Sequence, residues 1–196
     1  MRKRGNVASK PRGSVRIIGG EWRSRRLAIA EGTTVRPTPD RVRETVFNWL
    51  RDHVAGARCL DLFAGTGVLG FEALSRGAAH VTFVERDPKL IEALNAQAAT
   101  FGVRPRVVRQ EAESFLHGVV TARFDVIFVD PPYEAPLEPI LRLLPRWLAA
   151  GGPVYAERPR EQGLPQVTGA TWLKQSRAGA VDYGLLAFDA PAAGSA

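Results

Sequence analysis

The stretch Phe124-Asp125-Val126-Ile127-Phe128-Val129-Asp130-Pro131-Pro132-Tyr133 is an apolar run that ends in a carboxylate, two prolines and an aromatic ring. Its Phe, Val and Ile residues, interrupted only by Asp125, predict a central strand covered on both faces. Pro131 and Pro132 cannot continue a ladder, so Asp130 and Tyr133 should leave the sheet edge in a fixed direction. Because ligands of open α/β sheets bind just beyond such carboxyl ends, we expect a site here.

Similar apolar runs alternate with helical patterns on both sides of this stretch. The spacing predicts a doubly wound, mostly parallel sheet with right-handed crossovers, in which the last strand is antiparallel. Leu137 to Ala149 has the pattern of one amphipathic helix. The strands expected besides the central one lie near 58–62, 80–85, 106–109, 153–157, 172–176 and 181–188.

The positive charge of the chain is concentrated at its amino end. Residues 1–26 hold nine Lys or Arg against one acid, whereas the remaining 170 residues hold 18 basic and 19 acidic residues. Such an uneven distribution favours contact with a polyanion, most often nucleic acid. We expect a disordered basic arm over 1–13 and a small basic hairpin with Val15, Ile17, Trp22 and Leu27 on its apolar face.

A helix is expected to follow the hairpin, from Thr38 to about Asp52. Thr38 suits the N-cap and Pro39 suits the first helical position. Arg43 is expected to face solvent or a ligand, as are other arginines of this region. The candidate nucleic-acid contacts are Arg16, Arg23, Arg25, Arg36 and Arg41.

Composition indicates an intracellular protein. At 196 residues the chain can bury one sizeable core. Its single cysteine, Cys59, cannot form an intrachain disulfide, which is typical of a reducing compartment. No apolar run approaches the roughly 20 residues that a membrane span needs. We therefore expect a cytoplasmic monomer that does not bind membranes.

The glycine loop Gly65-x-Gly67-x-x-Gly70 follows the strand that ends at Asp61. Glycines are needed where a ligand must approach the backbone closely. Glu85, at the end of the next strand, stands where an acid accepts hydrogen bonds from ribose hydroxyls. The cofactor is therefore expected to contain a nucleoside, and this loop alone leaves open whether it is NAD or S-adenosylmethionine.

Two carboxylates favour S-adenosylmethionine. Asp61 would repel a pyrophosphate, but it suits the ammonium of a methionine moiety. Asp130 and the carbonyl of Pro131 or Pro132 can accept both hydrogens of an amino group attached to an aromatic base, and Tyr133 can stack on that base. This arrangement predicts methylation of an exocyclic amino group, in which positioning and electrostatics supply most of the acceleration.

These motifs resemble a known family. Asp61-Leu62-Phe63-Ala64-Gly65-Thr66-Gly67, Glu85 and Asp130-Pro131-Pro132-Tyr133 look like a Rossmann-like class I methyltransferase that uses S-adenosylmethionine. Together with Arg16-Ile17-Ile18-Gly19-Gly20, the segment from Arg36 to Leu50 resembles the bacterial RsmD family, which methylates the N2 amino group of a guanine in small-subunit (16S) ribosomal RNA. The similarity runs from about Arg16 to Phe188.

The resemblance implies a set of site residues and a partner. Glu111 stands where the family usually has an aspartate that meets the adenine. The implied partner is ribosomal RNA, either free or within a partly assembled small subunit, and no metal is implied. The implied cofactor-binding residues are Asp61, Phe63, Gly65, Gly67, Glu85, Arg86, Glu111 and Ala112, and the implied catalytic residues are Asp130, Pro131, Pro132 and Tyr133.

The expected organisation is a methyltransferase domain with an extension. Residues 1–13 form the arm, 14–56 the hairpin and helix, 57–189 the catalytic domain and 190–196 a tail. The alternative within enzymes is a DNA adenine-N6 methyltransferase, which we rank lower because no separate target-recognition region is evident. An NAD-dependent oxidoreductase and a nucleic-acid-binding protein that has lost catalysis are the alternatives from other classes.

Overall fold

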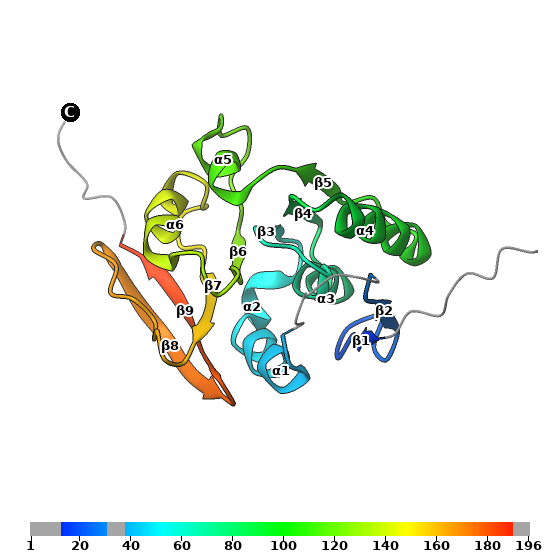
Figure 1. Cartoon of the computed structure of the whole chain (residues 1–196), viewed down its shortest axis with the longest axis horizontal. Helices are drawn as coiled ribbons and strands as arrows, with labels where there is room; N and C mark the ends of the chain where they lie inside the picture. The colour runs from blue at the N-terminus through cyan, green and yellow to red at the C-terminus, as the bar shows by residue number, and fades with distance from the viewer. Residues whose placement is uncertain (1–12, 31–37, 190–196) are drawn as a thin grey trace, which may run out of the picture.

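The computed structural model describes residues 13–30 and 38–189 of the chain (Figure 1). The expectations for Arg36, for residues 1–12 of the basic arm and for the tail at 190–196 lie outside the described residues.

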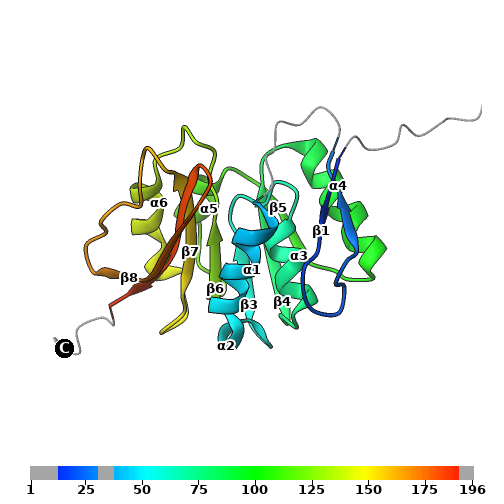
Figure 2. The ribbon, with the colours of Figure 1, turned by 90° about the horizontal axis from the view of Figure 1, so that it is seen from below.

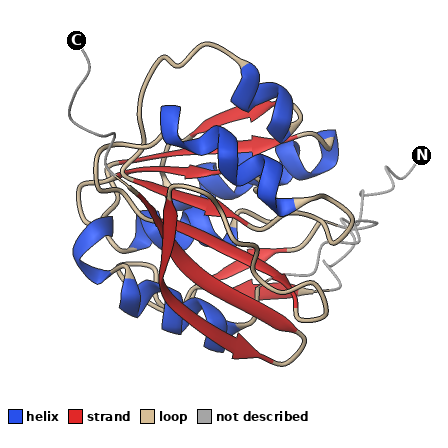
Figure 3. Ribbon diagram, turned by 90° about the vertical axis from the view of Figure 1, so that its left-hand side faces the viewer, coloured by secondary structure: helices blue, strands red, loops and turns tan. Residues whose placement is uncertain are grey.

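A seven-stranded sheet forms the centre of the molecule, in the order β5-β4-β3-β6-β7-β9-β8. The first five strands of this order run parallel, β9 is antiparallel to β7, and β8 is antiparallel to β9. The last two strands face the viewer in Figure 3. The predicted fold class is therefore confirmed. The strands are β3 (Arg58–Asp61), β4 (His80–Glu85), β5 (Arg106–Arg109), β6 (Val126–Val129), β7 (Val154–Pro159), β8 (Ala170–Ala178) and β9 (Val181–Phe188).

Helices cover both faces of the sheet (Figures 1 and 2). Side chains alternate along each strand, so Phe128 packs with α1, α3 and α4, while Ile127 packs with α5 and α6. Cys59 is fully buried in the first of these two cores, as its apolar context predicts. The helices are α1 (Asp40–Trp49), α2 (Arg51–Val54), α3 (Val68–Ser75), α4 (Pro88–Phe101), α5 (Ala112–His117) and α6 (Leu137–Leu143).

Two elements are shorter than the sequence pattern predicts. The amphipathic helix ends at Leu143 and continues only as a 3₁₀ turn, η1 (Leu144–Arg146). Pro145 lies in that turn and cannot donate the backbone hydrogen bond that an α-helix needs. The central strand begins at Val126, because Phe124 makes only an isolated bridge with Leu148.

The amino-terminal hairpin pairs β1 (Ser14–Arg16) with β2 (Arg26–Ala28). Its apolar side chains are buried as expected, and Trp22 stacks on Phe101 of α4 with 4.4 Å between the ring centroids. The expected hairpin is therefore confirmed, and it packs on the same face of the sheet as α3 and α4 (Figure 2).

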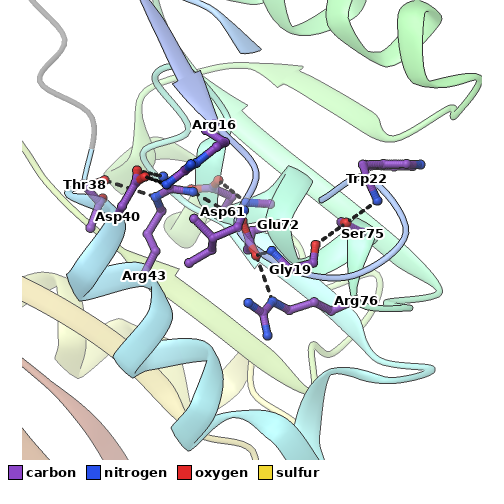
Figure 4. Close-up of polar contacts among 12 residues, drawn as sticks. Arg16, Gly19, Trp22, Thr38, Asp40, Arg43, Asp61, Glu72, Ser75 and Arg76 are labelled. Carbon is purple, nitrogen blue, oxygen red and sulfur yellow. Dashed lines mark hydrogen bonds and ion pairs between the residues drawn. The ribbon is translucent and has the colours of Figure 1, made fainter. Parts of the chain in front are cut away.

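Glu72 on α3 joins the hairpin to the sheet domain (Figure 4). Its fully buried carboxylate accepts hydrogen bonds from the backbone amides of Ile18 at 2.9 Å and Gly19 at 2.8 Å. It also forms ion pairs with Arg43 at 3.3 Å and Arg76 at 2.9 Å. These partners satisfy a charge that would be costly to bury alone.

The prediction that Arg43 faces solvent or a ligand is wrong. The side chain is 0% exposed and lies between Glu72 and Asp40, and its Nε donates to the carbonyl of Thr38 at 3.1 Å. Helical spacing placed Arg43 beside the apolar positions, and the buried Glu72 carboxylate makes that burial possible. Arg43 therefore anchors the start of α1 to α3.

Candidate active site

Three predicted site acids lie at the carboxyl edge of neighbouring parallel strands. Asp61 is the last residue of β3, Glu85 is the last residue of β4, and Asp130 directly follows β6. Because β3 lies between β4 and β6, Asp61 is the middle acid. Its charge interacts unfavourably with those of Glu85 and Asp130. This edge is where an open α/β sheet binds its ligands.

The glycine loop between β3 and α3 adopts the backbone that its sequence predicts. Gly65 and Gly67 have φ angles of 52° and 74°, in the left-handed region that favours glycine. A Cβ on Gly67 would lie 2.4 Å from Leu94 Cδ2, so the loop must also approach α4 closely. Substitution at Gly67 would therefore strain the backbone and force the Leu94 side chain to move.

Asp61 lies beneath this loop. Its carboxylate is 2% exposed and accepts a hydrogen bond from the Gly70 amide at 3.0 Å. Burial raises the pKa of Asp61 to about 7, and the charge of Glu85 adds to the rise. The carboxylate thus holds the first turn of α3, and a cationic partner would stabilise its charged form.

Glu85 is oriented by backbone amides. One carboxylate oxygen accepts from Gly65 at 2.8 Å, and the other accepts from Arg86 at 2.8 Å and Asp87 at 2.9 Å. Nearby, the exposed side chains of Arg86 and Glu111 form an ion pair of 3.2 Å. Ala112, the first residue of α5, is buried. The structure thus brings Glu85, Arg86 and Glu111 to one end of the sheet.

Phe63 contributes a partly buried ring. It packs against the core on the α5 and α6 face, and it lies in the loop between β3 and α3.

Asp130 accepts a hydrogen bond from the hydroxyl of Thr38 at 3.2 Å. Thr38 is therefore not the N-cap of α1, contrary to the prediction; Pro39 occupies that position and makes no side-chain cap. Removal from water raises the pKa of Asp130 well above its usual range, and Glu157 raises it further, while Thr38 lowers it. The contact joins the start of α1 to the end of the central strand.

The residues after Asp130 turn outward. Pro131 is buried, Pro132 is exposed, and Tyr133 is 43% exposed although its ring is large and apolar. The Gln162 side chain donates to the Tyr133 carbonyl at 3.1 Å, which fixes the turn. An exposed aromatic ring beside an acid can receive a flat, polar ligand.

Two residues near this acid were missed by the sequence interpretation. Tyr155 and Glu157 of β7 lie beside the end of β6, and the Tyr155 hydroxyl donates to Glu157 at 2.5 Å. The sequence signal for Glu157 is that it follows the apolar run Val154-Tyr155-Ala156 near the carboxyl end of a parallel strand. The acids at the ends of β3, β4 and β6 have the same kind of position.

The candidate nucleic-acid contacts within the described residues lie on the hairpin and on α1. Arg16, Arg23, Arg25 and Arg41 are all exposed. Arg16 pairs with Asp40 at 3.0 Å. The guanidinium of Arg25 lies over the Phe101 ring, 4.2 Å from its centroid, and donates to a carbonyl of α4. Arg23 and Arg41 therefore remain more open to a new partner than Arg25.

Within 13–30 and 38–189, no group of three or more His, Cys, Asp or Glu residues is arranged to hold a metal ion. Over the same ranges, no helix has the length and apolar character that a membrane span requires.

The parallel sheet, the glycine loop and the acids at its carboxyl edge define a Rossmann-like methyltransferase fold. A family model described as Conserved hypothetical protein 95 matches residues 15–187. The chain belongs to this family, the RsmD family that its motifs resemble.

Comparison with individual proteins agrees with this assignment. The chain is 45% identical over 179 residues to ribosomal RNA small subunit methyltransferase D of Escherichia coli K12, covering 88% of this chain and 89% of the relative. The solved structure of a candidate methyltransferase of Escherichia coli, yhhF, is 41% identical and covers 91% of this chain and 100% of its own, with a TM-score of 0.83. A candidate methyltransferase, SMU.776, complexed with SAH, shares only the fold, at 16% identity over 74% of this chain and 48% of its own, with a TM-score of 0.62.

Proposed function

We propose that this chain transfers a methyl group from S-adenosylmethionine to the N2 amino group of a guanine in 16S ribosomal RNA. The observation that carries the proposal is the position of Asp130. Its carboxylate stands at the carboxyl end of the central strand, next to the strand that bears Asp61 and the glycine loop. The acceptor for an amino group and the expected cofactor site therefore lie side by side.

The residues at the edge of β3 and β4 fit S-adenosylmethionine. Glu85, held by three backbone amides, would accept hydrogen bonds from the ribose hydroxyls. Asp61 would favour the ammonium of the methionine moiety, and Ala112 and Glu111 would meet the adenine. When bound, this cofactor supplies an electrophilic methyl group.

Asp130 and the turn after it would position the target base. The ring-attached amino nitrogen is a weak nucleophile, so its orientation decides the rate. Asp130 and the carbonyl of Pro131 or Pro132 would accept its two hydrogens, and the exposed ring of Tyr133 would stack on the base. The base must leave any stack it occupies in the RNA to reach this turn.

The arginines of the hairpin and of α1 would bind phosphates. The exposed Arg16, Arg23 and Arg41 would contact phosphates, which are the same in every RNA sequence. They would therefore set the affinity and orientation of the RNA, while the turn after Asp130 would determine which group is methylated. The name of the Escherichia coli relative supports small-subunit ribosomal RNA over DNA as the substrate. The choice of guanine N2 rests on the resemblance of the motifs to the RsmD family.

A direct experiment uses the wild-type chain and Asp130→Ala with labelled S-adenosylmethionine and small-subunit RNA, free and in partly assembled particles. We expect wild type to label one guanine and Asp130→Ala to label none, with cofactor affinity retained. Methyl transfer by Asp130→Ala at the wild-type rate would refute the assigned role. Labelling of adenine in DNA, and not of RNA, would establish the alternative substrate instead.

A further inference from the structure

Asp130 and Glu157 form a pair of carboxyl groups behind the turn of the proposed target site. In the parallel pairing of β6 with β7, Val129 lies opposite Ala156, so the next residues of the two strands are Asp130 and Glu157. Neighbouring parallel strands lie about 4.8 Å apart, and opposed side chains point to the same face. The two carboxyl groups are therefore neighbours at the carboxyl edge of the sheet.

Each carboxyl group of the pair also has a hydroxyl donor. The Thr38 hydroxyl donates to Asp130 at 3.2 Å, and the Tyr155 hydroxyl donates to Glu157 at 2.5 Å. Glu157 is 6% exposed and Tyr155 is fully buried. The four residues therefore form a chain of contacts from the start of α1 into β7, with Asp130 as its member at the turn.

The surroundings of the pair favour one negative charge over two. Asp61 places a further negative charge near Asp130. Burial raises the pKa of Tyr155, and Tyr183 raises it further. Removal from water raises the pKa of Asp130 well above its usual range, with Glu157 as the next cause. Two neighbouring carboxyl groups repel each other when both are charged, which favours a state in which the pair keeps one proton.

We propose that Glu157 is a positioning residue for Asp130: it shares one proton with Asp130 and thereby holds that carboxyl group as an oriented acceptor at the turn. This inference rests on the proposed function, because it gives Asp130 the amino group of a base as its ligand. Glu157 itself lies behind Asp130 and touches no substrate. Its hydrogen bond fixes one oxygen of Asp130, so that the other acceptor sites face outward.

The pair predicts a particular dependence on pH. Below the upper pKa of the pair the shared proton is present and Asp130 is oriented. When the pH rises above the upper pKa of the pair, the proton is lost and two negative charges repel each other, so the rate should fall. Glu157→Gln replaces the shared proton by a permanent amide N–H donor of the same shape, so this fall in rate should disappear in that variant.

Three variants and one control test the proposal with the full chain. Glu157→Ala should lower kcat at least about tenfold with the KM values for RNA and S-adenosylmethionine nearly unchanged, since Asp130 loses the partner that orients it. Glu157→Gln should restore most of kcat at neutral pH. Tyr155→Phe should give a smaller loss, and Glu161→Gln, an exposed acid beyond β7, should behave as wild type.

A second measurement needs neither substrate nor activity. In a ¹³C carboxyl NMR titration, Asp130 of the wild-type chain should titrate well above the usual value of about 3.9, and in Glu157→Gln its pKa should move down toward that value. Identical titration of Asp130 in both chains would overturn the proposal. Equal loss of kcat in Glu157→Ala and Glu157→Gln would overturn it as well. If wild type fails to methylate RNA, the proposed function fails, while the titration still decides whether the pair shares a proton.

Discussion

The hydroxyl of Thr38, at the entrance to α1, donates a hydrogen bond to the carboxylate of Asp130, 92 residues later in the chain. Thr38 is itself held by Arg43, whose side chain is buried against Glu72 of α3. The segment before the sheet domain therefore contributes a hydrogen-bond donor to the acid at the end of the central strand. It is a structural part of the candidate active site as well as a basic surface.

Thr38→Val should test this contact. Valine keeps the shape of threonine but cannot donate, and a hydrogen bond to a charged group is worth about 1.5–3 kcal/mol. If the bond orients Asp130 for reaction, kcat should fall by roughly tenfold to a hundredfold while cofactor affinity holds. Thr38→Ser is the control, because serine retains the hydroxyl. Steady-state kinetics should show that its kcat stays near that of wild type. Unchanged kcat in the valine variant would make the contact incidental.

Binding of S-adenosylmethionine should depend on pH through Asp61. In the free protein the pKa of Asp61 is raised to about 7, so the carboxyl group is mostly protonated below that pH. A bound ammonium favours the charged form, so binding must release a proton there. Affinity should therefore rise by up to about tenfold per pH unit toward pH 7 and level off above it.

Asp61→Asn is the matched variant for this pH dependence of binding. Its amide oxygen can still accept the Gly70 hydrogen bond, so the loop keeps its support while the charge is lost. Calorimetric affinities should be weaker and flat across the same pH range. A pH dependence as steep as that of wild type would assign the proton to another group.

Glu72→Ala should destabilise the fold. The substitution leaves the buried Arg43 guanidinium without its acid and removes the acceptor of two hairpin amides. Breaking a buried ion pair in this way costs about 3–5 kcal/mol. Chemical denaturation should report that loss, whereas Glu44→Ala, an exposed change on α1, should alter stability by less than about 0.5 kcal/mol. Equal stabilities of the two variants would show that the Glu72 contacts contribute little.

Removal of one hairpin charge should weaken RNA binding with a defined salt signature. Arg23→Ala should lower affinity across RNA sequences and reduce the slope of log K against log salt by about 1. Arg142→Ala is the control, because Arg142 is also exposed but lies on α6, far from the hairpin in Figure 1. If Arg23→Ala leaves the slope at the wild-type value, as Arg142→Ala should, then Arg23 is not part of the proposed interface.

The residues that local patterns predicted correctly are those whose neighbours in the chain decide their conformation. The apolar run before Asp130 forms β6, and Gly67 has the positive φ angle that its loop requires. Both follow from spacing and from the steric freedom of glycine. The positions of Asp61, Glu85 and Asp130 at one edge follow from the parallel order of the strands.

The errors occurred where a distant partner decides the outcome. Thr38 is a residue type favoured at helix N-caps, but its hydroxyl donates a hydrogen bond to Asp130. Arg43 carries a charge that predicts exposure, but Glu72, 29 residues away, allows it to be buried. No local pattern contains these pairings, since they depend on how α1 packs across the sheet edge.

We propose that the Asp-Pro-Pro-Tyr turn presents a guanine of small-subunit ribosomal RNA to a methyl donor. The most direct measurement is mass-spectrometric mapping of methylated nucleotides in that RNA from cells with the wild-type chain, without it, or with Asp130→Ala. We predict that a single N2-methylguanine is present with the wild-type chain and absent from the other two. An unchanged set of methylated nucleotides in all three would contradict the account.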